Sequence, residues 1–546
     1  MAERPRLSVV LLALNEEARI ARCLESLRWV EEVVVIDGMS TDRTAEICRR
    51  WGARVIPHAF AGSFAQERNL GMEAATGQWV LQLDADDVVT PEFRAAIERL
   101  LAAPQAHAAF KFRRQSVLLG RVMRRGGWHH YLPNLVRRDA VRYEGLVHER
   151  PIVQGSIGWL EADVEHHPCD TLEAFVARHN RYTTLQAQEL RATLGRLDER
   201  TIRRRLRRRP WKVFWKSYVK KQGFREGLHG LVFAVFFAGV ELLKWAKYWE
   251  LCLEPRPPGG PPPPTPQELP AARAQDQALR ARASVSVVLM AKNEERRLAA
   301  CLDRVAGWAD EIVVMDDLST DRTVEIARRY TDRVFSIPSE DNHDLQWNRG
   351  IARSTKDWIL HIDADEVVTP QLRQAIDRRL ADAQDASAFE LMRKNVFLGH
   401  PMRRGGWYHR HLVLFRRERA RCVGKGIHVK LQVDGRIGVL DAELEHYPFS
   451  SLTQFMGRQN HYTSVEARGL RERLRAVPAR AVAYQVGWRP VKLFWKSYVK
   501  NRGREEGMHG LVFALLYAFV HALLWAKCWE AGLPQETAGP ARSAVR

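Results

Sequence analysis

The sequence has few cysteines and no paired ones. Its seven cysteines are scattered over 546 residues, are odd in number and form no Cys-x-x-Cys spacing. A disulfide-stapled secreted fold and a cysteine-based zinc site are therefore both disfavoured, and a reducing cytoplasm is the simplest setting. The N-terminus also lacks an apolar signal segment with a small-residue cleavage site, so we expect the chain to stay in the cytoplasm.

The sequence also lacks an uninterrupted apolar run of the roughly 20 residues that a simple membrane-spanning helix needs. Residues 228–243 are interrupted by His229 and Glu241, and residues 508–524 by two histidines. Arginine, lysine and tryptophan border these stretches, which favours helices associated peripherally with the cytoplasmic face of a bilayer. A pair of buried helices that packs the two halves of the chain together is the alternative.

Acidic residues are in the minority. The chain has 85 Lys and Arg against 65 Asp and Glu, a formal charge of +20. Such an excess favours anionic partners such as anionic lipid, phosphorylated substrate or nucleic acid. No recognised nucleic-acid module is present, so no nucleic-acid partner is expected. The chain is too long for one hydrophobic core, and at least two domains follow.

One long internal duplication accounts for most of the chain. The segment LSVVLLALNEEARIARCLESL at 7–27 returns as VSVVLMAKNEERRLAACLDRV at 285–305, and WVLQLDADDVVTP at 79–91 returns as WILHIDADEVVTP at 358–370. The late segment FWKSYVKKQGFREGLHGLVFA at 214–234 also returns, at 494–514. Repeats of this length predict two tandem modules.

The boundaries follow from the repeat and from a proline-rich segment between the copies. We predict a first module over 1–253 with C-terminal helices from about 201, a linker over 254–283, a second module over 284–532 with C-terminal helices from about 478, and a flexible tail over 533–546.

Strands and helices alternate in each copy. In the first, apolar runs predict strands at 7–14, 32–37, 54–57 and 79–84, and helical spacing follows from residue 20 and at 42–52 and 64–76. Strands that are apolar throughout, alternating with helices, predict an α/β fold with a mostly parallel, Rossmann-like sheet. Polar residues follow the strands, where parallel sheets bind their ligands.

An Asp-Ala-Asp motif ends the last of these strands in both copies, as Asp84 and Asp86 and as Asp363 and Asp365. Clustered carboxylates suit Mg²⁺ or Mn²⁺ bound together with a substrate diphosphate. The alternative is a pair of solvated carboxylates that cap the next helix near Thr90-Pro91. The recurrence of the motif in both copies favours the metal site.

The residues LNEE, the strand-end Asp before Ser-Thr-Asp and the Asp-Ala-Asp motif resemble family 2 glycosyltransferases of the GT-A fold. The further combination of FAQERNLGMEAATGQWVLQLDADD, RRGGWHH, GLVHE and FWKSY is similar to lipopolysaccharide core transferases that add glucose to heptose. The resemblance implies an inverting, Mg²⁺- or Mn²⁺-dependent enzyme. Its donor would be a nucleotide-sugar, UDP-linked by preference, and its acceptor a lipid-linked oligosaccharide at the cytoplasmic face of the inner membrane.

The resemblance also implies roles for matching residues in the two copies. It places the nucleotide base at Asp37 and Asp316, and ribose or metal-bound diphosphate at Asp84 and Asp363, with the metal held by these and by Asp86 and Asp365. The nucleotide pocket would be lined by Asn15, Glu17, Asn293 and Glu295.

An inverting transferase needs a base for the acceptor proton. Glu149, after His148, is the candidate in the first copy, and a surface acid is the alternative. The second copy reads His428-Val429, so the carboxylate is missing. Either His428 replaces it or that module is impaired. A histidine in such an apolar context is more often a hydrogen-bonded structural residue than a catalyst, so a structural role for His148 and His428 is the alternative.

Several functional readings remain open at this point. The modules can add two sugars in succession, or the first can catalyse while the second binds acceptor or membrane. A non-enzymatic basic protein that binds glycans or nucleic acid is a further alternative. A sugar-phosphate nucleotidyltransferase would have a similar sheet, but its Gly-rich basic loop is absent after Leu14 and Lys292.

Two further groups of residues recur. Gln66, Arg68 and Asn69, with Gln346 and Asn348 in the second copy, lie on a predicted helix that can contact donor phosphates, although an exposed helix face is the favoured explanation. Arg-Gly-Gly-Trp at 125–128 and 404–407 offers a cation for phosphate and an aromatic plate for a sugar, or a turn with a packed tryptophan.

Overall fold

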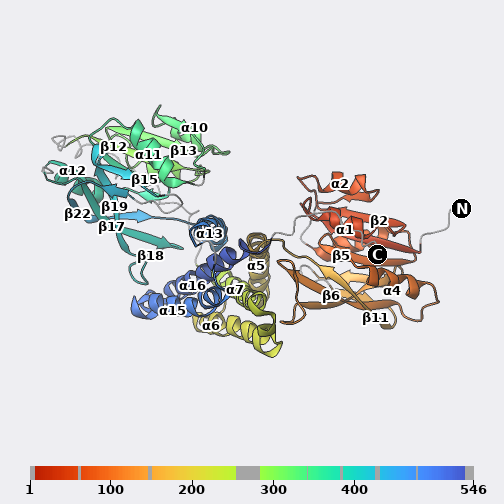
Figure 1. Cartoon of the computed structure of the whole chain (residues 1–546). Coiled ribbons are helices and arrows are strands. Elements are labelled where there is room, and N and C mark those ends of the chain that lie inside the picture. The colour runs from red at the N-terminus through yellow and green to blue at the C-terminus, as the bar shows by residue number, and fades with distance from the viewer. Residues whose placement is uncertain are drawn as a thin grey trace. The chain divides into compact units, whose positions relative to one another are not determined.

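The computed structural model describes residues 6–59, 63–145, 150–253, 283–340, 342–381, 385–424, 431–474 and 477–534 (Figure 1). Nearly all of the predicted linker, and the predicted tail beyond Pro534, lie outside these residues. The chain divides into two compact units, which are Met1–Phe175 with Phe214–Ala234 and Gln535–Arg546, and Val176–Val213 with Val235–Pro534.

The first unit contains a nine-stranded sheet with strand order β3-β2-β1-β4-β8-β6-β11-β5, and β7 pairs with β6. Strands β1 to β4 form its parallel half, and β8 continues the sheet antiparallel to β4 and β6. The strands are β1 (Leu7–Ala13), β2 (Glu32–Asp37), β3 (Arg54–Pro57), β4 (Trp79–Asp84), β5 (Asp87–Val89), β6 (Ala109–Leu118), β7 (Arg121–Val122), β8 (His129–Arg137) and β11 (Ile157–His166). A separate antiparallel pair is formed by β9 (Val141–Glu144) and β10 (Arg150–Val153).

The second unit repeats this topology, with strand order β14-β13-β12-β15-β19-β17-β22-β16 and β18 paired with β17. Its strands are β12 (Val285–Ala291), β13 (Glu311–Asp316), β14 (Val334–Ser336), β15 (Trp358–Asp363), β16 (Glu366–Val367), β17 (Ala388–Phe397), β18 (His400–Met402), β19 (His409–Arg416) and β22 (Ile437–His446), with the separate pair β20 (Ala420–Cys422) and β21 (Leu431–Val433). Two α/β modules with parallel-rich sheets are therefore confirmed.

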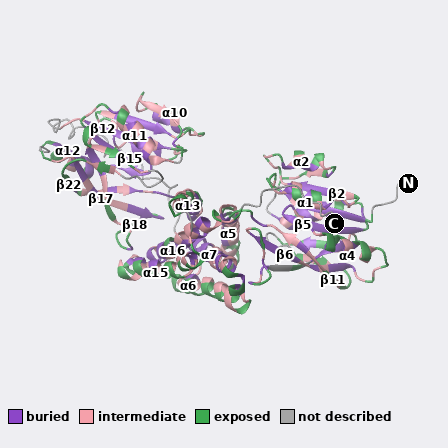
Figure 2. Cartoon of the chain, viewed as in Figure 1, coloured by how far each residue is buried: buried purple, intermediate pink, exposed green. Residues whose placement is uncertain are grey.

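Each sheet is covered on both faces. In β1, Val9 and Leu11 pack with one group of buried side chains, whereas Val10 packs with another. Because successive side chains of a strand point to opposite faces, a strand buried on both sides must be apolar throughout. Figure 2 shows the strands of both sheets largely buried. This is the reason that β1, LSVVLLA, is apolar at every position except the buried Ser8.

The helices of the sheet regions agree closely with the periodicity of the sequence. They are α1 (Ile20–Ser26), α2 (Thr44–Arg50), α3 (Phe64–Ala74) and α4 (Pro91–Leu101) in the first module, and α9 (Leu298–Leu302), α10 (Thr323–Ala327), α11 (His343–Arg353) and α12 (Pro370–Ala381) in the second. The side chain of Thr90 caps α4 by accepting a hydrogen bond from the backbone of Phe93. A helix cap therefore does follow the Asp-Ala-Asp motif, but it is made by the threonine.

Long helices follow each sheet. The first copy has α5 (Leu172–Leu194), α6 (Glu199–Trp215), a π-helical turn η1 (Lys216–Lys220), η2 (Gly223–Glu226) and α7 (Gly227–Glu250). The second has α13 (Leu452–Leu474), α14 (Ala479–Ala483), η4 (Tyr484–Trp488), α15 (Arg489–Trp495), η5 (Lys496–Lys500), η6 (Gly503–Glu506) and α16 (Gly507–Glu530). A short 3-10 turn, η3 (Arg417–Arg419), precedes β20.

The apolar helices are longer than predicted from the sequence. Two continuous helical segments, Gly223–Glu250 and Gly503–Glu530, are each long and apolar enough by composition to cross a membrane, so the expectation that both fall short is wrong. The interrupting histidines and Glu241 do not end the helices. A buried core helix of a soluble protein can be equally long and equally apolar, so these two properties do not by themselves place either helix across a membrane.

Within the second unit, helices from both copies pack in one bundle. Gly239 of α7 lies against the ring of Phe519 in α16, and Trp249 contacts the ring of His509. Asn180 donates to the backbone oxygen of Thr453, 2.9 Å away. These contacts bury much of the apolar surface that the sequence offers for a membrane, and burial of apolar surface stabilises such a bundle.

Substitution of Gly510 by alanine is expected to destabilise the second unit by about 1–3 kcal/mol, because a well-packed site resists an added methyl group. A Cβ at Gly510 would lie 1.8 Å from the backbone oxygen of Gly503, which cannot rotate away as a side chain can. The measurement is the midpoint of urea unfolding followed by circular dichroism.

Gly469→Ala is the matched control for this measurement. Gly469 lies within α13, and a Cβ there would meet no atom within 4 Å. Alanine should stabilise the helix there by about 0.5–1 kcal/mol. Equal effects of the two substitutions would show that helix propensity, and not the close contact of α16 with Gly503, decides the outcome.

Candidate active site

Polar residues from three neighbouring strands meet at one edge of the first sheet. Strand β1 lies between β2 and β4, and in register Ala13 pairs with Asp37 while Leu12 pairs with Asp84. Asn15 follows β1 two residues later. Because β1, β2 and β4 are parallel, their carboxyl ends lie together, at the position where α/β sheets bind ligands.

Asn15 and Glu17 connect the loop after β1 to the loop after β2. The side-chain oxygen of Asn15 accepts from the backbone of Thr41 at 2.8 Å, and Glu17 accepts from the backbone of Arg43 at 3.0 Å. Asp37 is buried and accepts a hydrogen bond from the Ser40 hydroxyl. These contacts fix the two loops that border the predicted nucleotide pocket, and direct contact with a nucleotide stays a prediction.

The second module repeats this arrangement. Asn293 accepts from the backbone of Thr320 at 2.8 Å, Glu295 from the backbone of Arg322 at 3.3 Å, and buried Asp316 from the backbone of Ser319 at 3.2 Å. Asn15 and Asn293 share a backbone angle φ of 54°. Asparagine tolerates this left-handed conformation better than most residues, which explains why it occurs at both turns.

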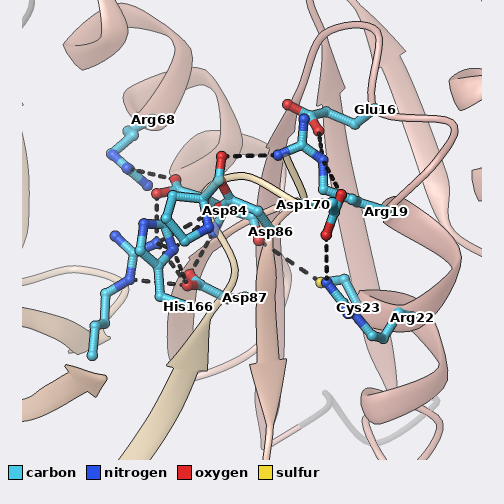
Figure 3. Close-up of polar contacts among 12 residues, drawn as sticks. Glu16, Arg19, Arg22, Cys23, Arg68, Asp84, Asp86, Asp87, His166 and Asp170 are labelled. Carbon is cyan, nitrogen blue, oxygen red and sulfur yellow. Dashed lines mark hydrogen bonds and ion pairs between the residues drawn. The ribbon is translucent and has the colours of Figure 1, made fainter. Parts of the chain in front are cut away.

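Two arginines bind Asp84, and Figure 3 labels one of them, Arg68. Arg68 of α3 donates to one of its carboxylate oxygens at 2.9 Å, and Arg114 of β6 donates to the other at 2.8 Å. Arg114 also binds Asp87, which is fully buried and accepts a second hydrogen bond from the backbone of Asp84. The turn after β4 is therefore held by buried charge pairs from distant segments.

Asp86 is the second carboxylate of the motif, and it faces His166 at the end of β11. Its Oδ1 atom lies 3.3 Å from His166 Nδ1, which is also 3.0 Å from Asp87 Oδ1. Asp86, Asp87 and His166 each offer one ligand atom, and the three atoms lie within 4.8 Å of one another. Two carboxylates suit Mg²⁺ or Mn²⁺, and an imidazole is more readily accepted by Mn²⁺ than by Mg²⁺.

The ionisation of this cluster follows from its charge pairs. Burial alone would raise the pKa of Asp84, but Arg114 and Arg68 lower it well below its usual range. Burial and Arg114 would lower the pKa of His166, but Asp86 and Asp87 raise it to about 9. Asp84, Asp86 and Asp87 therefore face Arg68, Arg114 and the His166 ring, whose Nδ1 atom also lies 2.9 Å from Arg114. A metal ion would bind His166 only through a ring nitrogen that carries no proton.

Asp363 of the second module has one arginine where Asp84 has two. Arg393, at the position of Arg114, lies 3.4 Å from Asp363 and 2.7 Å from Glu366, which stands at the position of Asp87. Trp347 occupies the position of Arg68 and packs at a tilt against the His361 ring, with the ring centroids 4.4 Å apart. Burial, Glu366 and Asp365 raise the pKa of Asp363 to about 6, against the effect of Arg393. The two sites therefore differ in charge.

Asp365 is surrounded by cations and by a histidine. Arg458 of α13 donates to its Oδ2 atom at 3.1 Å, and His446 Nε2 lies 3.5 Å from its Oδ1 atom. Arg458 also pairs with Glu294, which follows β12, at 2.7 Å. Burial would raise the pKa of Asp365, but His446 and Arg458 lower it below its usual range. An ionised carboxylate at the strand end is what a cation would require.

A cavity of about 1120 Å³ opens at this edge of the second sheet. Acidic and basic side chains, among them Glu294, Asp363 and Arg458, line one part of it, and apolar residues of α16 line another. The volume is large for a single small ligand, for which 300–1,000 Å³ is typical. A cavity with charged and apolar parts suits a ligand with both characters.

The Arg-Gly-Gly-Trp segments are turns with packed tryptophans. Trp128 is buried against Phe233 at 4.8 Å, and Trp407 stacks on Phe513 at 4.8 Å. Trp407 nevertheless lines the cavity of the second module. The interpretation as a packed turn therefore holds for Trp128, while Trp407 serves as both core and cavity wall.

The predicted acceptor bases cannot be placed. His148, Glu149 and His428 lie outside the described residues, so their roles stay predictions. The favoured interpretation of the polar residues on α3 and α11 as an exposed helix face is wrong for Arg68 of α3 and for Gln346 of α11, which are buried. Arg68 is held inside by its charge pair with Asp84, and Asn69 is held by hydrogen bonds with the backbone of Tyr143.

Sequence reasoning missed several members of the cluster. The missed residues are Arg114, His166, Arg393, His446 and Arg458. One signal was available, since Arg114 and Arg393, and likewise His166 and His446, stand at matching positions in the two copies. A charged residue kept at the same strand position in both copies can indicate a buried partner, because an unpaired buried charge is strongly unfavourable.

Comparison with known proteins gives one consistent result. Residues 8–149 and 286–432, together more than half of the chain, match the model of the family described as Glycosyl transferase family 2. A lipopolysaccharide core biosynthesis glycosyltransferase, LpsC of Rhizobium meliloti, is 27% identical over 46% of this chain and 95% of its own length. An uncharacterised glycosyltransferase of Rickettsia typhi is 26% identical over 46% of this chain and 88% of its own.

The alignment with each relative spans nearly all of that relative but less than half of this chain, so one relative corresponds in length to one module. Among solved structures, a glucosyl-3-phosphoglycerate synthase from Mycobacterium tuberculosis in complex with Mn²⁺ and UDP aligns over 35% of this chain and 81% of its own, with 20% identity and a TM-score of 0.26. By the family match in both copies, this chain belongs to glycosyl transferase family 2 and is a glycosyltransferase.

Proposed function

We propose that this glycosyltransferase moves a sugar, with inversion, from a UDP-sugar to a lipopolysaccharide-core or related envelope glycolipid. The observation that carries the proposal is the repeated cluster of carboxylates, histidine and arginine at the carboxyl ends of the parallel strands, in a chain of this family. The relative that bears a lipopolysaccharide core name supports the acceptor class.

Asp84, Asp86, Asp363 and Asp365 would hold Mg²⁺ or Mn²⁺ between the protein and the donor diphosphate, with His166 as a further ligand in the first module. When bound, the metal would stabilise the negative charge of the departing nucleoside diphosphate. The loops fixed by Asn15, Glu17 and Asp37, and by Asn293, Glu295 and Asp316, would receive the nucleotide. Glu149, or His428 in the second module, would accept the acceptor proton.

A second arrangement has the first module as the catalyst and the second as an acceptor-binding module. The specific observations in its favour are Trp347 in place of Arg68 and Val429 in place of Glu149. Both changes remove charge from the second module. If the second module only binds the glycolipid acceptor, it needs its cavity but no catalytic base.

The proposal is tested by turnover of a panel of UDP-, GDP- and ADP-sugars by the full chain with a glycolipid acceptor extracted from bacterial envelopes. We expect one UDP-sugar to be consumed, EDTA to abolish turnover, and Mg²⁺ or Mn²⁺ to restore it. NMR of the product should show the anomeric configuration opposite to that of the donor. Turnover that is indifferent to EDTA would remove the metal from the mechanism, and a retained configuration would remove the single displacement.

A further inference from the structure

An exposed apolar stripe runs along the helical segment between α13 and α16. Tyr484, Trp488, Val491 and Trp495 are spaced by four, three and four residues, which places them on one side of a helix. Their exposed fractions are 39%, 56%, 50% and 57%. On the other side of the same segment, Val482, Val486 and Leu493 are buried. We refer to the four exposed residues as the aromatic stripe.

The charge around the aromatic stripe has one sign. Residues 479–500 contain Arg480, Arg489, Lys492, Lys496 and Lys500 and no acidic residue, and all five cations are exposed. Exposed tryptophans bordered by cations are unfavourable in water but suit the headgroup region of a bilayer, where Trp is favoured and anionic lipids attract Lys and Arg. The exposed side chains of this segment therefore match the headgroup region of an anionic bilayer in both polarity and charge.

The first copy carries a related stripe at the matching positions. Arg204, Arg208, Trp211 and Trp215 stand where the second copy has Tyr484, Trp488, Val491 and Trp495, and both tryptophans are exposed. Residues 199–220 contain ten cations and one acid. Two aromatic positions are thus replaced by arginine, which keeps the character of an amphipathic, membrane-surface helix but shifts its balance towards electrostatic attraction.

The apolar helices themselves do not offer this surface. In α16, Leu511, Val512, Ala514 and Leu516 are buried within the second unit. The bundle contacts of Phe519 and His509 also use the apolar face of α16. A membrane contact that inserted this helix would have to unpack it, whereas the aromatic stripe is exposed without any rearrangement.

We propose that the aromatic stripe, with its counterpart in the first copy, is the surface that docks the enzyme on an anionic lipid bilayer. Docking would be interfacial, with the tryptophans among the headgroups and the cations against anionic lipid. The helical segment that carries the aromatic stripe also contributes Lys496 and Ser497 to the wall of the active-site cavity. Docking there would bring the cavity of the second module close to the headgroups that carry a glycolipid acceptor.

The proposal deepens the proposed function by naming the partner surface, but its test needs no sugar transfer. The full chain is floated with vesicles of phosphatidylcholine alone or with about 30% phosphatidylglycerol. We expect binding only to the anionic vesicles, and weaker binding when salt is raised from about 0.1 to about 0.5 M. Absence of binding to anionic vesicles would overturn the proposal even if the enzyme transfers sugar in solution.

Two variants test the residues. W211S/W215S/W488S/V491S/W495S removes the exposed apolar side chains and should weaken partitioning by about tenfold or more. R480Q/R489Q/K492Q should lower binding and also reduce its salt dependence. The control is I437S/V439S, which removes two exposed apolar side chains of β22, 47% and 45% exposed, and should bind as the wild type does. Thermal unfolding by circular dichroism shows whether each variant is folded.

Unchanged vesicle binding by folded stripe variants would overturn the proposal, as would an equal loss in the control. The same cations can attract the phosphates of nucleic acid, so a short RNA duplex is included as a competitor. If the duplex binds more tightly than the vesicles and the stripe variants lose that binding, the surface belongs to nucleic acid and the membrane assignment is wrong. If the duplex leaves vesicle binding unchanged, the bilayer is the partner.

Discussion

Alanine in place of Asp86 is expected to lower sugar transfer by the first module by about a hundredfold or more, because a metal that stabilises the leaving diphosphate contributes several kcal/mol to the transition state. Asp365→Ala should have the same effect on the second module. Both carboxylates stand at equivalent strand ends beside a histidine, His166 or His446. The measurement is the rate of nucleoside diphosphate release with each donor that the wild type consumes.

The pattern of the two single variants assigns the chemistry. Loss in one of them alone places transfer in that module and leaves the other as a binding module. Loss in each for a different donor shows that the modules add two sugars. Asp139→Ala and Glu418→Ala are matched controls, since these exposed acids occupy equivalent positions in the two copies and lie away from the site. Full turnover by the double variant Asp86→Ala/Asp365→Ala would exclude both proposed metal sites.

The second large effect is expected from Arg114→Met, which should destabilise the first unit by about 3–5 kcal/mol, the usual result of removing one partner of a buried charge pair. Arg114 is 6% exposed and binds Asp84 at 2.8 Å and Asp87 at 2.7 Å. Without it, His166 would be the only basic side chain within ion-pair distance of buried Asp87 in the described part of the chain. Urea unfolding followed by circular dichroism measures the change.

The neighbouring residue supplies the control. Arg113→Met removes a pair with Asp163 in which both side chains are substantially exposed, and such pairs contribute about 0–1 kcal/mol. The second copy carries Met392 at this position, so the fold accommodates methionine there. Arg114→Lys keeps the charge but not the planar guanidinium group, and its destabilisation should lie between those of Arg113→Met and Arg114→Met. Similar shifts for Arg113→Met and Arg114→Met would contradict the account of the buried cluster.

Local patterns in the sequence were sufficient for the sheet and for one edge of the site. Strands β2, β3 and β4 begin and end as predicted. For β4, which is buried along most of its length, the reason is that a strand covered on both faces must be largely apolar, so that polar residues mark its end. The meeting of Asn15, Asp37 and Asp84 at one edge follows from parallel pairing alone. Repetition added weight, since each feature was found twice.

The cations of the site could not be predicted from local patterns in the sequence. Arg114 lies 30 residues after Asp84 in another strand, and Arg458 lies 93 residues after Asp365 in a helix. Nothing local to either motif indicates such a partner. The difference between Arg68 and Trp347 likewise became informative only with the structure, in which Arg68 binds Asp84 and Trp347 packs against His361. The ionisation of a carboxylate depends on the charges around it in space.

The sequence by itself determined that this chain is two tandem α/β modules of a glycosyltransferase, with carboxylates at the strand ends, because the apolar runs, the repeat and the family motifs can be recognised without knowledge of any three-dimensional contact. Only the tertiary structure decided which cations neutralise those carboxylates, and that the apolar helices of the two copies bury one another while a stripe of tryptophans remains exposed. Composition shows how apolar a helix is, but which of its faces is covered depends on segments far away in the chain.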